Sequence, residues 1–589
     1  MNEMSGAEAF VRMLELFGVE HIFGLCGDTS LPFYDALYRH GQGITHILTR
    51  DERSAAYMAD GYARVSGKVG VCEGPSGGGA TYILPGVVEA SESSIPVLAI
   101  TTDISVGGRG RYTLTELDQE ALFRPLAKWN RVIDRATDIP RTVRAAFTQM
   151  TSGRPGAAHI GLPYDIQREP VDEREIWGDA RLGRFPSRRF GPDPAAIEAA
   201  AALLLAAKNP LFICGGGVVI SGAETELEKV AEWLGAAAAS TVSGHGSLAD
   251  KHPLAVGVVG SNGGTMPTRA VVEMADVVVF VGCRAGSVTT ERWRFPTPGK
   301  VKVIHIDADP AVLGANYPTA VAIVSDARLA LAELRCLLAE QPRPAIVRDL
   351  NAGRVAQAKE EKFAAFAALA CSDERPIRPE RVVADMQAVL REDAVIVADP
   401  GTPCPYFSAY YQLARAGRYL WSNRAHGALG YAMAAAVGAA YGRPGARIVS
   451  MMGDGSFGFT SGELETIVRH KLPIMMVVIS NAAFGWIKSG QKAGYGERYF
   501  LVDFTRTDHA AVAAAYGVKS WRVEDPAELR GALKPPPRRA SRPLSTSSAS
   551  RCTKQTRRSA NGWRKADERE NRAANIELIR GEASNDQSR

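Results

Sequence analysis

Short apolar runs of strand length alternate with amphipathic helical segments along most of this 589-residue chain. Apolar runs without in-and-out alternation indicate strands that are buried on both faces, and the helices between them supply parallel crossovers. The expected strands are residues 21–25, 69–72, 97–100, 158–160, 210–213, 277–281, 301–306, 394–398, 447–452 and 474–480. The alternation therefore predicts an α/β fold made of doubly wound parallel sheets.

Two linkers divide this pattern into three units. An Arg- and Pro-containing stretch runs through residues 181–193, and a second, partly helical linker runs through residues 340–378. We expect an N-terminal domain over residues 1–175, a central domain over 190–340 and a C-terminal domain over 375–534. Each unit has about 150 residues, the usual size of one domain, and the whole chain is too long for one core.

The last segment, residues 535–589, breaks the pattern. It opens with prolines and arginines and continues through Ser/Thr-rich and mixed-charge sequence, a composition that predicts disorder. An α/β domain should add a closing strand after the helix expected at residues 526–533, and no such strand is evident. One hypothesis is a frameshift, because residues 543–563 can be back-translated so that another frame contains a strand-like segment. The nucleotide sequence tests the frameshift hypothesis, which fails if the codons do not permit that second reading.

The net charge of +5 comes from this tail. Residues 536–589 hold 13 Lys+Arg and 6 Asp+Glu, whereas the rest of the chain holds 56 Lys+Arg and 58 Asp+Glu and is nearly neutral. A nucleic-acid surface needs a basic face on a folded domain, so we expect no nucleic-acid partner. No apolar run reaches the roughly 18–20 residues of a membrane span, and no secretory signal is present, so we expect no membrane partner. Eight scattered cysteines without a CxxC pair indicate reduced thiols and a cytoplasmic location.

Two polar residues stand at the ends of successive expected strands. Asp454 follows one strand within Gly453-Asp454-Gly455-Ser456, and Asn481 ends the next, 27 positions downstream, with one helix expected between them. In a βαβ unit both side chains emerge at the same edge of the sheet, where ligands bind. A carboxylate, an amide oxygen and a loop carbonyl, for which we choose Ala483, are ligands that Mg²⁺ shares with substrate phosphates. The pair therefore predicts a magnesium–diphosphate site.

The alternative for each residue alone is simpler, because an isolated Asp-Gly is most often a turn and an isolated Asn a helix cap. The strand before each residue and the spacing favour the metal site. Gly453 and Gly455 let the backbone approach phosphates closely, and the N–H groups of Gly455 and Ser456 can donate to them.

The Gly453-Asp454-Gly455 turn and Asn481 resemble the signature of thiamine diphosphate (ThDP)-dependent enzymes, which often have Asn-Asn where this chain has Ser480-Asn481. The segment Thr49–Arg64 is similar to the HEQGAAHMADGYAR-type segment of acetolactate synthases and related decarboxylases. This resemblance implies that Glu52 hydrogen-bonds N1' of the cofactor's aminopyrimidine and so helps to form its carbon nucleophile. Taken alone, Glu52 reads as an exposed carboxylate paired with a neighbouring arginine.

Further matches extend the resemblance over residues 3–533. Ser76–Thr81 resembles the SGPGAT turn, with glycine in place of proline, and Gly427-Ala428-Leu429-Gly430 resembles the GTMG segment. The resemblance implies that Leu429 supports the bent cofactor and that the backbone at Gly427 and Leu429 grips the pyrimidine; the alternative is a core leucine. It places Thr402 near the diphosphate. The three domains would be pyrimidine-binding, central Rossmann-like and diphosphate-binding.

The resemblance implies ThDP- and Mg²⁺-dependent decarboxylation of a 2-oxo acid, with carboligation to an acceptor. In the family the site lies between two subunits, which implies a homodimer or homotetramer. The alternatives are a non-ligating decarboxylase, another acyl-transferring or C–C-cleaving ThDP enzyme, or an inactive homologue with an altered C-terminus.

Several departures leave these alternatives open. The AFQE pattern of synthases appears as Leu114-Thr115-Glu116, and the RFDDR pattern keeps only Arg284, which we expect to face solvent. No His-His pair typical of pyruvate decarboxylases occurs, and His426 reads as structural more readily than as a pocket acid or base. Gly215-Gly216-Gly217 is not GxGxxG and predicts a Rossmann-like turn, so FAD, which synthases often bind in the middle domain, stays open.

Overall fold

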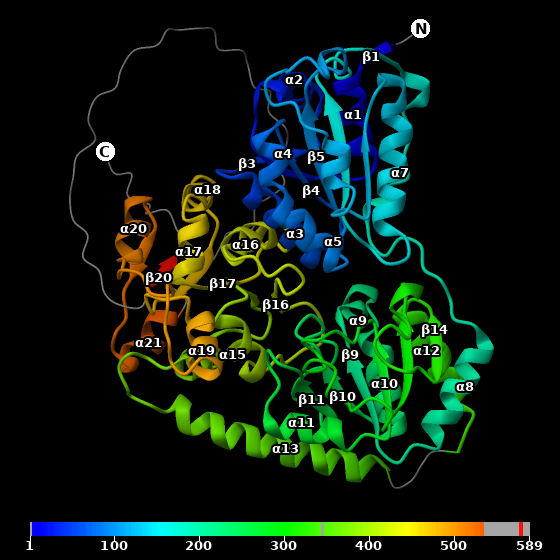
Figure 1. Ribbon diagram of the computed structural model, residues 1–589, viewed down its shortest axis with the longest axis vertical. Coiled ribbons are helices and arrows are strands. Elements are labelled where there is room, and N and C mark those ends of the chain that lie inside the picture. The colour runs from blue at the N-terminus through cyan, green and yellow to red at the C-terminus, as the bar shows by residue number, and fades with distance from the viewer. Residues whose placement is uncertain (1–2, 343–346, 535–576, 581–589) are drawn as a thin grey trace, which may run out of the picture.

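The computed structural model describes residues 3–342, 347–534 and 577–580. Three six-stranded sheets flanked by helices form the N-terminal, central and C-terminal parts of the molecule (Figure 1). The predicted α/β class with three doubly wound sheets is confirmed. Among the helices of these ranges, none is long and apolar enough to cross a membrane. The seven cysteines that can be described are all free thiols, as the sequence predicted.

The N-terminal sheet has the strand order β3-β2-β4-β5-β7-β6, and all its strands are parallel. Its strands are β2 His21–Gly24, β3 Thr45–Leu48, β4 Gly70–Gly74, β5 Val97–Asp103, β6 Trp129–Val132 and β7 Ala158–Pro163. Its helices are α1 Gly6–Leu16, α2 Leu31–His40, α3 Glu52–Ser66, α4 Gly78–Tyr82, α5 Leu84–Glu92, α6 Gln119–Phe123 and α7 Ile139–Thr151. A separate antiparallel pair joins β1 Glu3–Ser5 to β8 Pro170–Asp172.

The central sheet has the order β11-β10-β9-β12-β13-β14, which is the order typical of dinucleotide-binding domains. Its strands are β9 Pro210–Cys214, β10 Ala237–Ser240, β11 Ala255–Val258, β12 Val277–Val281, β13 Lys302–Asp307 and β14 Val321–Val324. Its helices are α8 Pro194–Leu205, α9 Gly216–Ser221, α10 Glu224–Leu234, α11 Met266–Glu273 and α12 Ala327–Ala339. The long helix α13 Val347–Ala370 crosses from this part to the C-terminal part along the lower edge of Figure 1.

The C-terminal sheet has the order β16-β15-β17-β18-β20-β19, which repeats the order of the N-terminal sheet. Its strands are β15 Val395–Ala398, β16 Leu420–Ser422, β17 Ile448–Gly453, β18 Ile474–Ile479, β19 Lys519–Trp521 and β20 Glu577–Arg580. Its helices are α14 Pro379–Val389, α15 Pro403–Tyr410, α16 Tyr431–Gly442, α17 Asp454–Thr460, α18 Glu463–Arg469, α19 Gly485–Gly494, α20 His509–Ala515 and α21 Pro526–Leu533.

Strand β20 lies inside the segment 535–589 that composition predicted to be disordered. It fills the place between β18 and β19 and runs antiparallel to both. The corresponding place in the N-terminal sheet holds the parallel strand β7. The expectation of no closing strand is therefore wrong for these four residues, because pairing with two distant strands outweighs local composition. The remaining residues of the tail lie outside the described ranges.

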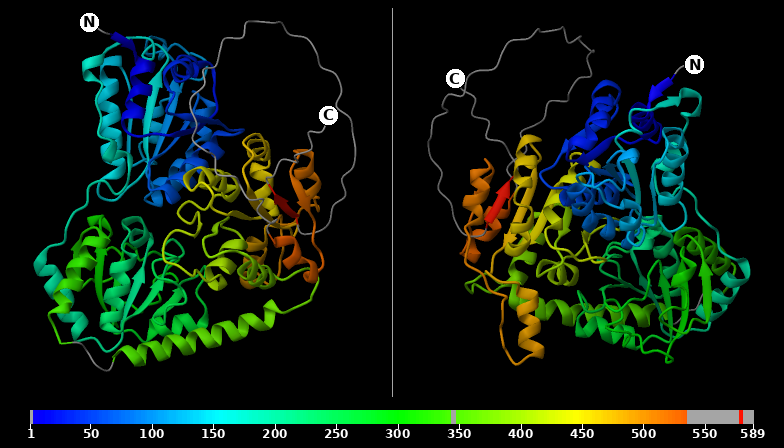
Figure 2. Two further views of the ribbon diagram at one scale, coloured as in Figure 1. Left: turned by 180° about the vertical axis from the view of Figure 1, so that it is seen from behind. Right: turned by 45° about the horizontal axis from the view of Figure 1, so that its top comes forward.

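Helices α3 and α16 form the main contact between the N-terminal and C-terminal parts, and they lie side by side in Figure 1. The contact is reciprocal and depends on glycine. A Cβ added at Gly61 of α3 would overlap the carbonyl of Ala435, and one added at Gly438 of α16 would overlap the carbonyl of Met58. In both views of Figure 2 the blue and yellow helices meet at this contact, and the green central part lies beside both.

Candidate functional site

Asp454 and Asn481 lie together at the carboxyl edge of the C-terminal sheet. Strands β17 and β18 are adjacent and parallel, with Gly453 opposite Ile479, so the residues that follow the two strands emerge at the same edge. The Oδ2 atom of Asp454 accepts hydrogen bonds from the backbone nitrogens of Asn481 at 2.8 Å and Ala482 at 2.6 Å. The predicted juxtaposition is confirmed. The expectation of one helix between them is wrong, because Asp454 itself begins α17, ahead of α18.

Thr402 joins this pair from a different strand end. The glycine Gly485 lies between the two side chains, since a Cβ there would be 2.6 Å from Nδ2 of Asn481 and 3.1 Å from Oγ1 of Thr402. The Oδ1 atom of Asn481 accepts a bond from the nitrogen of Ala483 at 3.2 Å, and the Ala483 carbonyl accepts one from Gly485 at 2.8 Å. Asn481, Ala483 and Thr402 therefore lie close together around Gly485.

The oxygen atoms of this region suit a hard divalent cation. Asp454, Asn481 and Ala483 offer a carboxylate, an amide oxygen and a backbone carbonyl, which is the donor chemistry that Mg²⁺ prefers. Ala482 is held at φ +53°, a left-handed conformation that an alanine adopts only when surrounding contacts impose it. The residues therefore fit a magnesium ion bound together with phosphate oxygens.

The glycine turn beside Asp454 is closely packed. A Cβ at Gly455 would lie 2.8 Å from Cε1 of Phe484, so the ring would have to shift to admit one, whereas a Cβ at Gly453 would meet nothing closer than 4.0 Å. The nitrogen of Gly455 donates to Oδ1 of Asp454 at 2.8 Å, so this N–H is engaged within the chain. Ser456 is buried at the start of α17. Gly455 and Ser456 thus follow Asp454 directly in the first turn of α17.

The segment Gly427–Gly430 forms a turn before α16. Gly427 has φ +78° and Gly430 has φ +84°, both in the left-handed region that favours glycine. Leu429 is only half-buried, so the alternative of a core leucine does not describe it. His426 is exposed, and its backbone nitrogen donates a hydrogen bond to Oε2 of Glu89 at 2.7 Å.

Asp399 holds the start of α16, a role that its sequence context did not predict. Its Oδ1 atom accepts bonds from the nitrogens of Tyr431 at 2.9 Å and Ala432 at 3.3 Å. Burial raises the pKa of Asp399 to about 7, although these backbone bonds act in the opposite direction. In the sequence, the feature that could have identified Asp399 was its position directly after the strand that became β15.

Glu52 is the first residue of α3 and is only 7% exposed. Arg53 pairs with Asp51 at 2.8 Å, so the alternative of an exposed glutamate paired with Arg53 is wrong. Burial raises the pKa of Glu52 above its ordinary value. The Glu52 side chain lies against Gly74 at the end of β4, where a Cβ would be 3.2 Å from Cγ of Glu52. A glutamate in this environment holds a proton more readily than one in water.

A series of hydroxyl groups lies at the same edge of the N-terminal sheet. Oγ of Ser76 lies 2.7 Å from Oγ1 of Thr115 and 3.2 Å from Oγ1 of Thr29, and Thr29 lies 2.8 Å from Oγ1 of Thr102. Thr115 has φ +69°, and a Cβ at Gly77 would lie 2.8 Å from its Cβ. The Leu114-Thr115-Glu116 segment therefore contacts the Ser76 turn, a grouping that sequence reasoning missed.

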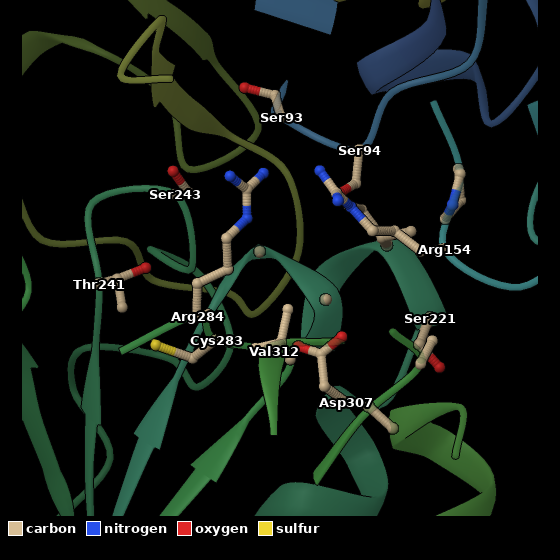
Figure 3. Close-up of a pocket in the computed structure, with 18 of the residues that line it drawn as sticks. Ser93, Ser94, Arg154, Ser221, Thr241, Ser243, Cys283, Arg284, Asp307 and Val312 are labelled. Carbon is tan, nitrogen blue, oxygen red and sulfur yellow. The ribbon is translucent and has the colours of Figure 1, made fainter. Parts of the chain in front are cut away.

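The central part carries a cavity of about 390 Å³ where all three parts meet (Figure 3). It lies at the switch point of the sheet, beyond the ends of β9 and β12, with Gly215-Gly216-Gly217 at the start of α9. The guanidinium groups of Arg154 and Arg284 point into the same space in Figure 3. Arg284 is exposed, as expected, and its Nη1 also lies 2.7 Å from Oε2 of the exposed Glu92.

Comparison with known proteins supports one family throughout. Residues 4–122 match the thiamine pyrophosphate enzyme N-terminal TPP binding domain, residues 197–334 the central domain, and residues 399–536 the C-terminal TPP binding domain. The probable acetolactate synthase large subunit of Methanocaldococcus jannaschii is 36% identical over 541 residues, covering 90% of this chain and 89% of that protein. The acetolactate synthase isozyme 3 large subunit of Escherichia coli is 30% identical over 540 residues, covering 90% and 92%.

Proposed function

The chain belongs to the family of thiamine pyrophosphate enzymes, and from that membership we propose that it decarboxylates a 2-oxo acid and joins the remaining acyl carbon to an acceptor. The observation that carries the proposal is the contact of Asp454 with the loop that carries Asn481. Relatives named acetolactate synthases, aligned over about nine-tenths of the chain, favour carboligation as the outcome. Bound ThDP would supply the carbon nucleophile and the electron sink for loss of CO₂.

The C-terminal part would hold the diphosphate end of the cofactor. Asp454, Asn481 and the Ala483 carbonyl are proposed to bind Mg²⁺, because their oxygens lie around one polar region at the sheet edge. Thr402, beside Asn481, is proposed to contact the diphosphate, and the backbone of Gly453, Gly455 and Ser456 to let it approach closely.

The pyrimidine end would contact the turn before α16. The backbone at Gly427 is left-handed, and the half-buried Leu429 offers an apolar surface for a bent cofactor. Glu52 is proposed to hold a proton against N1' of the aminopyrimidine. Its pKa, raised by burial, supports this role, because a buried glutamic acid holds its proton more readily than an exposed one.

We propose that the working unit is a homodimer or homotetramer, with Glu52 of one subunit serving the cofactor held by another. Sedimentation or light scattering of the purified protein measures this directly. A monomer with full activity contradicts it.

The central cavity is proposed to bind FAD. Support comes from the strand order of the sheet, the glycine turn after β9 and the two arginines that face the cavity. The visible absorption spectrum of the purified protein tests this: a flavin spectrum that survives gel filtration supports the proposal, and its absence after FAD is added contradicts it.

One assay separates the proposed reaction from its alternatives. Purified protein with ThDP and Mg²⁺ is screened for CO₂ release from several 2-oxo acids, with and without a second 2-oxo acid or an aldehyde. A carboligase releases CO₂ and forms a ligated product that depends on the acceptor. Aldehyde as the sole product indicates a non-ligating decarboxylase, and ThDP binding without turnover indicates an inactive homologue.

A further inference from the structure

The N-terminal and C-terminal sheets place their cofactor segments in equivalent positions. Both sheets share one strand order, and α3 and α16 each follow the second strand of their sheet along the chain. Glu52 begins α3, and the Gly427–Gly430 turn precedes α16. Because α3 packs on α16, the segment before each helix lies against a helix of the opposite part.

One of these contacts is made by Glu463 on α18 of the C-terminal part. Its Oε1 atom accepts a hydrogen bond from the backbone nitrogen of Arg50 at 2.9 Å, two residues before Glu52. Its Oε2 atom accepts one from Oγ1 of Thr466 at 2.7 Å. Glu463 is only 1% exposed, so a buried carboxylate bonds the backbone that enters α3.

The matching contact is made by Glu89 on α5 of the N-terminal part. Its Oε2 atom accepts a hydrogen bond from the backbone nitrogen of His426 at 2.7 Å, the residue before Gly427. Its Oε1 atom accepts bonds from Oγ of Ser93 at 2.6 Å and from Nη2 of Arg64 at 3.2 Å. Glu89 is fully buried, and both of its carboxylate oxygens accept hydrogen bonds.

We propose that Glu89 and Glu463 are positioning residues, each of which holds the cofactor segment of the opposite part. Glu463 fixes the turn that presents Glu52, and Glu89 fixes the turn that presents Gly427 and Leu429. The inference rests on the proposed function, because it assigns these two segments to the pyrimidine of ThDP. Bonds from a backbone N–H to a buried carboxylate are among the stronger hydrogen bonds in proteins, and each glutamate has other partners that prevent it from turning away.

The two glutamates are expected to affect different quantities. Loss of the Glu463 contact displaces Glu52, so the rate of hydrogen–deuterium exchange at C2 of bound ThDP falls about tenfold at saturating cofactor. Loss of the Glu89 contact loosens the pyrimidine turn, so the Kd for ThDP rises about tenfold. If the two glutamates served stability alone, their variants would have lower melting temperatures, but the exchange rate and the Kd would not respond separately to the two substitutions.

The test uses the full chain with ThDP and Mg²⁺. Glu463→Ala and Glu89→Ala remove each carboxylate, and Glu463→Gln and Glu89→Gln keep an acceptor oxygen and are expected to stay within about threefold of the wild type. Glu463→Asp and Glu89→Asp keep the charge but move the carboxylate away from the backbone nitrogen that it binds. They replace the alanine variants in the test if those variants do not fold. The matched control is Glu291→Ala, which removes a buried glutamate paired with Arg269 in the central part.

The expected result is slower exchange for Glu463 variants, a higher Kd for Glu89 variants, and neither change for Glu291→Ala. Folded alanine or aspartate variants with wild-type exchange and Kd overturn the inference, as does an equal loss of both quantities in all variants including the control. If the wild type itself neither binds ThDP nor promotes exchange, the proposed function fails instead.

Discussion

The carboxylate of Asp454 organises the loop that carries Asn481. Its Oδ2 atom lies 2.8 Å from the Asn481 nitrogen and 2.6 Å from the Ala482 nitrogen, while Oδ1 accepts the nitrogen of Gly455. One side chain thus joins the ends of two neighbouring strands. Asp454 is therefore proposed both as a metal ligand and as the group that orients the second ligand.

Glu52→Gln is expected to leave ThDP binding within about threefold and to lower turnover by at least about a hundredfold. Glutamine keeps the size of the side chain and cannot exchange a proton with N1'. The measurement is turnover at saturating ThDP, with Kd determined separately. Unchanged turnover removes Glu52 from the proposed role.

Asp399→Asn is expected to change how stability depends on pH. Burial raises the pKa of Asp399 from 3.8 to about 7, so the folded chain holds this proton more tightly than the unfolded chain. The stability from this group is full below pH 3.8 and is lost as pH rises toward 7. Over this pH interval the free energy of unfolding of the wild type should therefore fall by on the order of 1–4 kcal/mol more than that of Asp399→Asn. Denaturant unfolding without cofactor measures it; parallel pH profiles contradict it.

Gly438→Ala is expected to destabilise the contact between α3 and α16 by about 1–3 kcal/mol, because the new methyl group overlaps the carbonyl of Met58. The control is Gly490→Ala in α19, where a Cβ meets nothing within 4 Å and helix propensity predicts a gain of about 0.5–1 kcal/mol. Thermal unfolding of both variants measures the difference. Equal stabilities would show that the glycine contact is unimportant.

Removal of β20 is expected to weaken the cofactor site. The strand pairs with residues 475–478 of β18, whose next residues lead to Asn481. A chain ending at residue 576 should unfold at lower temperature and bind ThDP at least about tenfold more weakly, since its two neighbouring strands lose their partner. A chain ending at residue 580 keeps the strand and is the control. Equal behaviour of the two truncations contradicts the pairing.

Local patterns predicted much of this fold. The helix at residues 526–533 and the strand at 277–281 lie where the sequence placed them, because capping residues and unbroken apolar runs mark such elements directly. Asp454 was identified from its place at a strand end, and Glu52 from the resemblance of its segment to that of acetolactate synthases. The strand at 577–580 was missed because its pairing is with distant strands, and sequence composition carries no signal for that.

Contacts between distant segments could not be predicted in the same way. Arg284 is exposed as expected, but its ion pair with Glu92, from a helix of another part of the chain, was not predicted. The contacts of Glu89 with His426 and of Glu463 with Arg50 join residues more than 300 positions apart. Each depends on how α3 packs on α16, which no local pattern describes.

Thermal unfolding with ThDP and Mg²⁺ tests the central claim most directly. We predict that saturating ThDP with Mg²⁺ raises the melting temperature of the wild type, as binding to the folded state requires, and that ThDP with a chelator does not. Asp454→Ala should abolish the shift, while Glu52→Gln should keep it. No shift in the wild type, or an unchanged shift in Asp454→Ala, would contradict the magnesium–ThDP site.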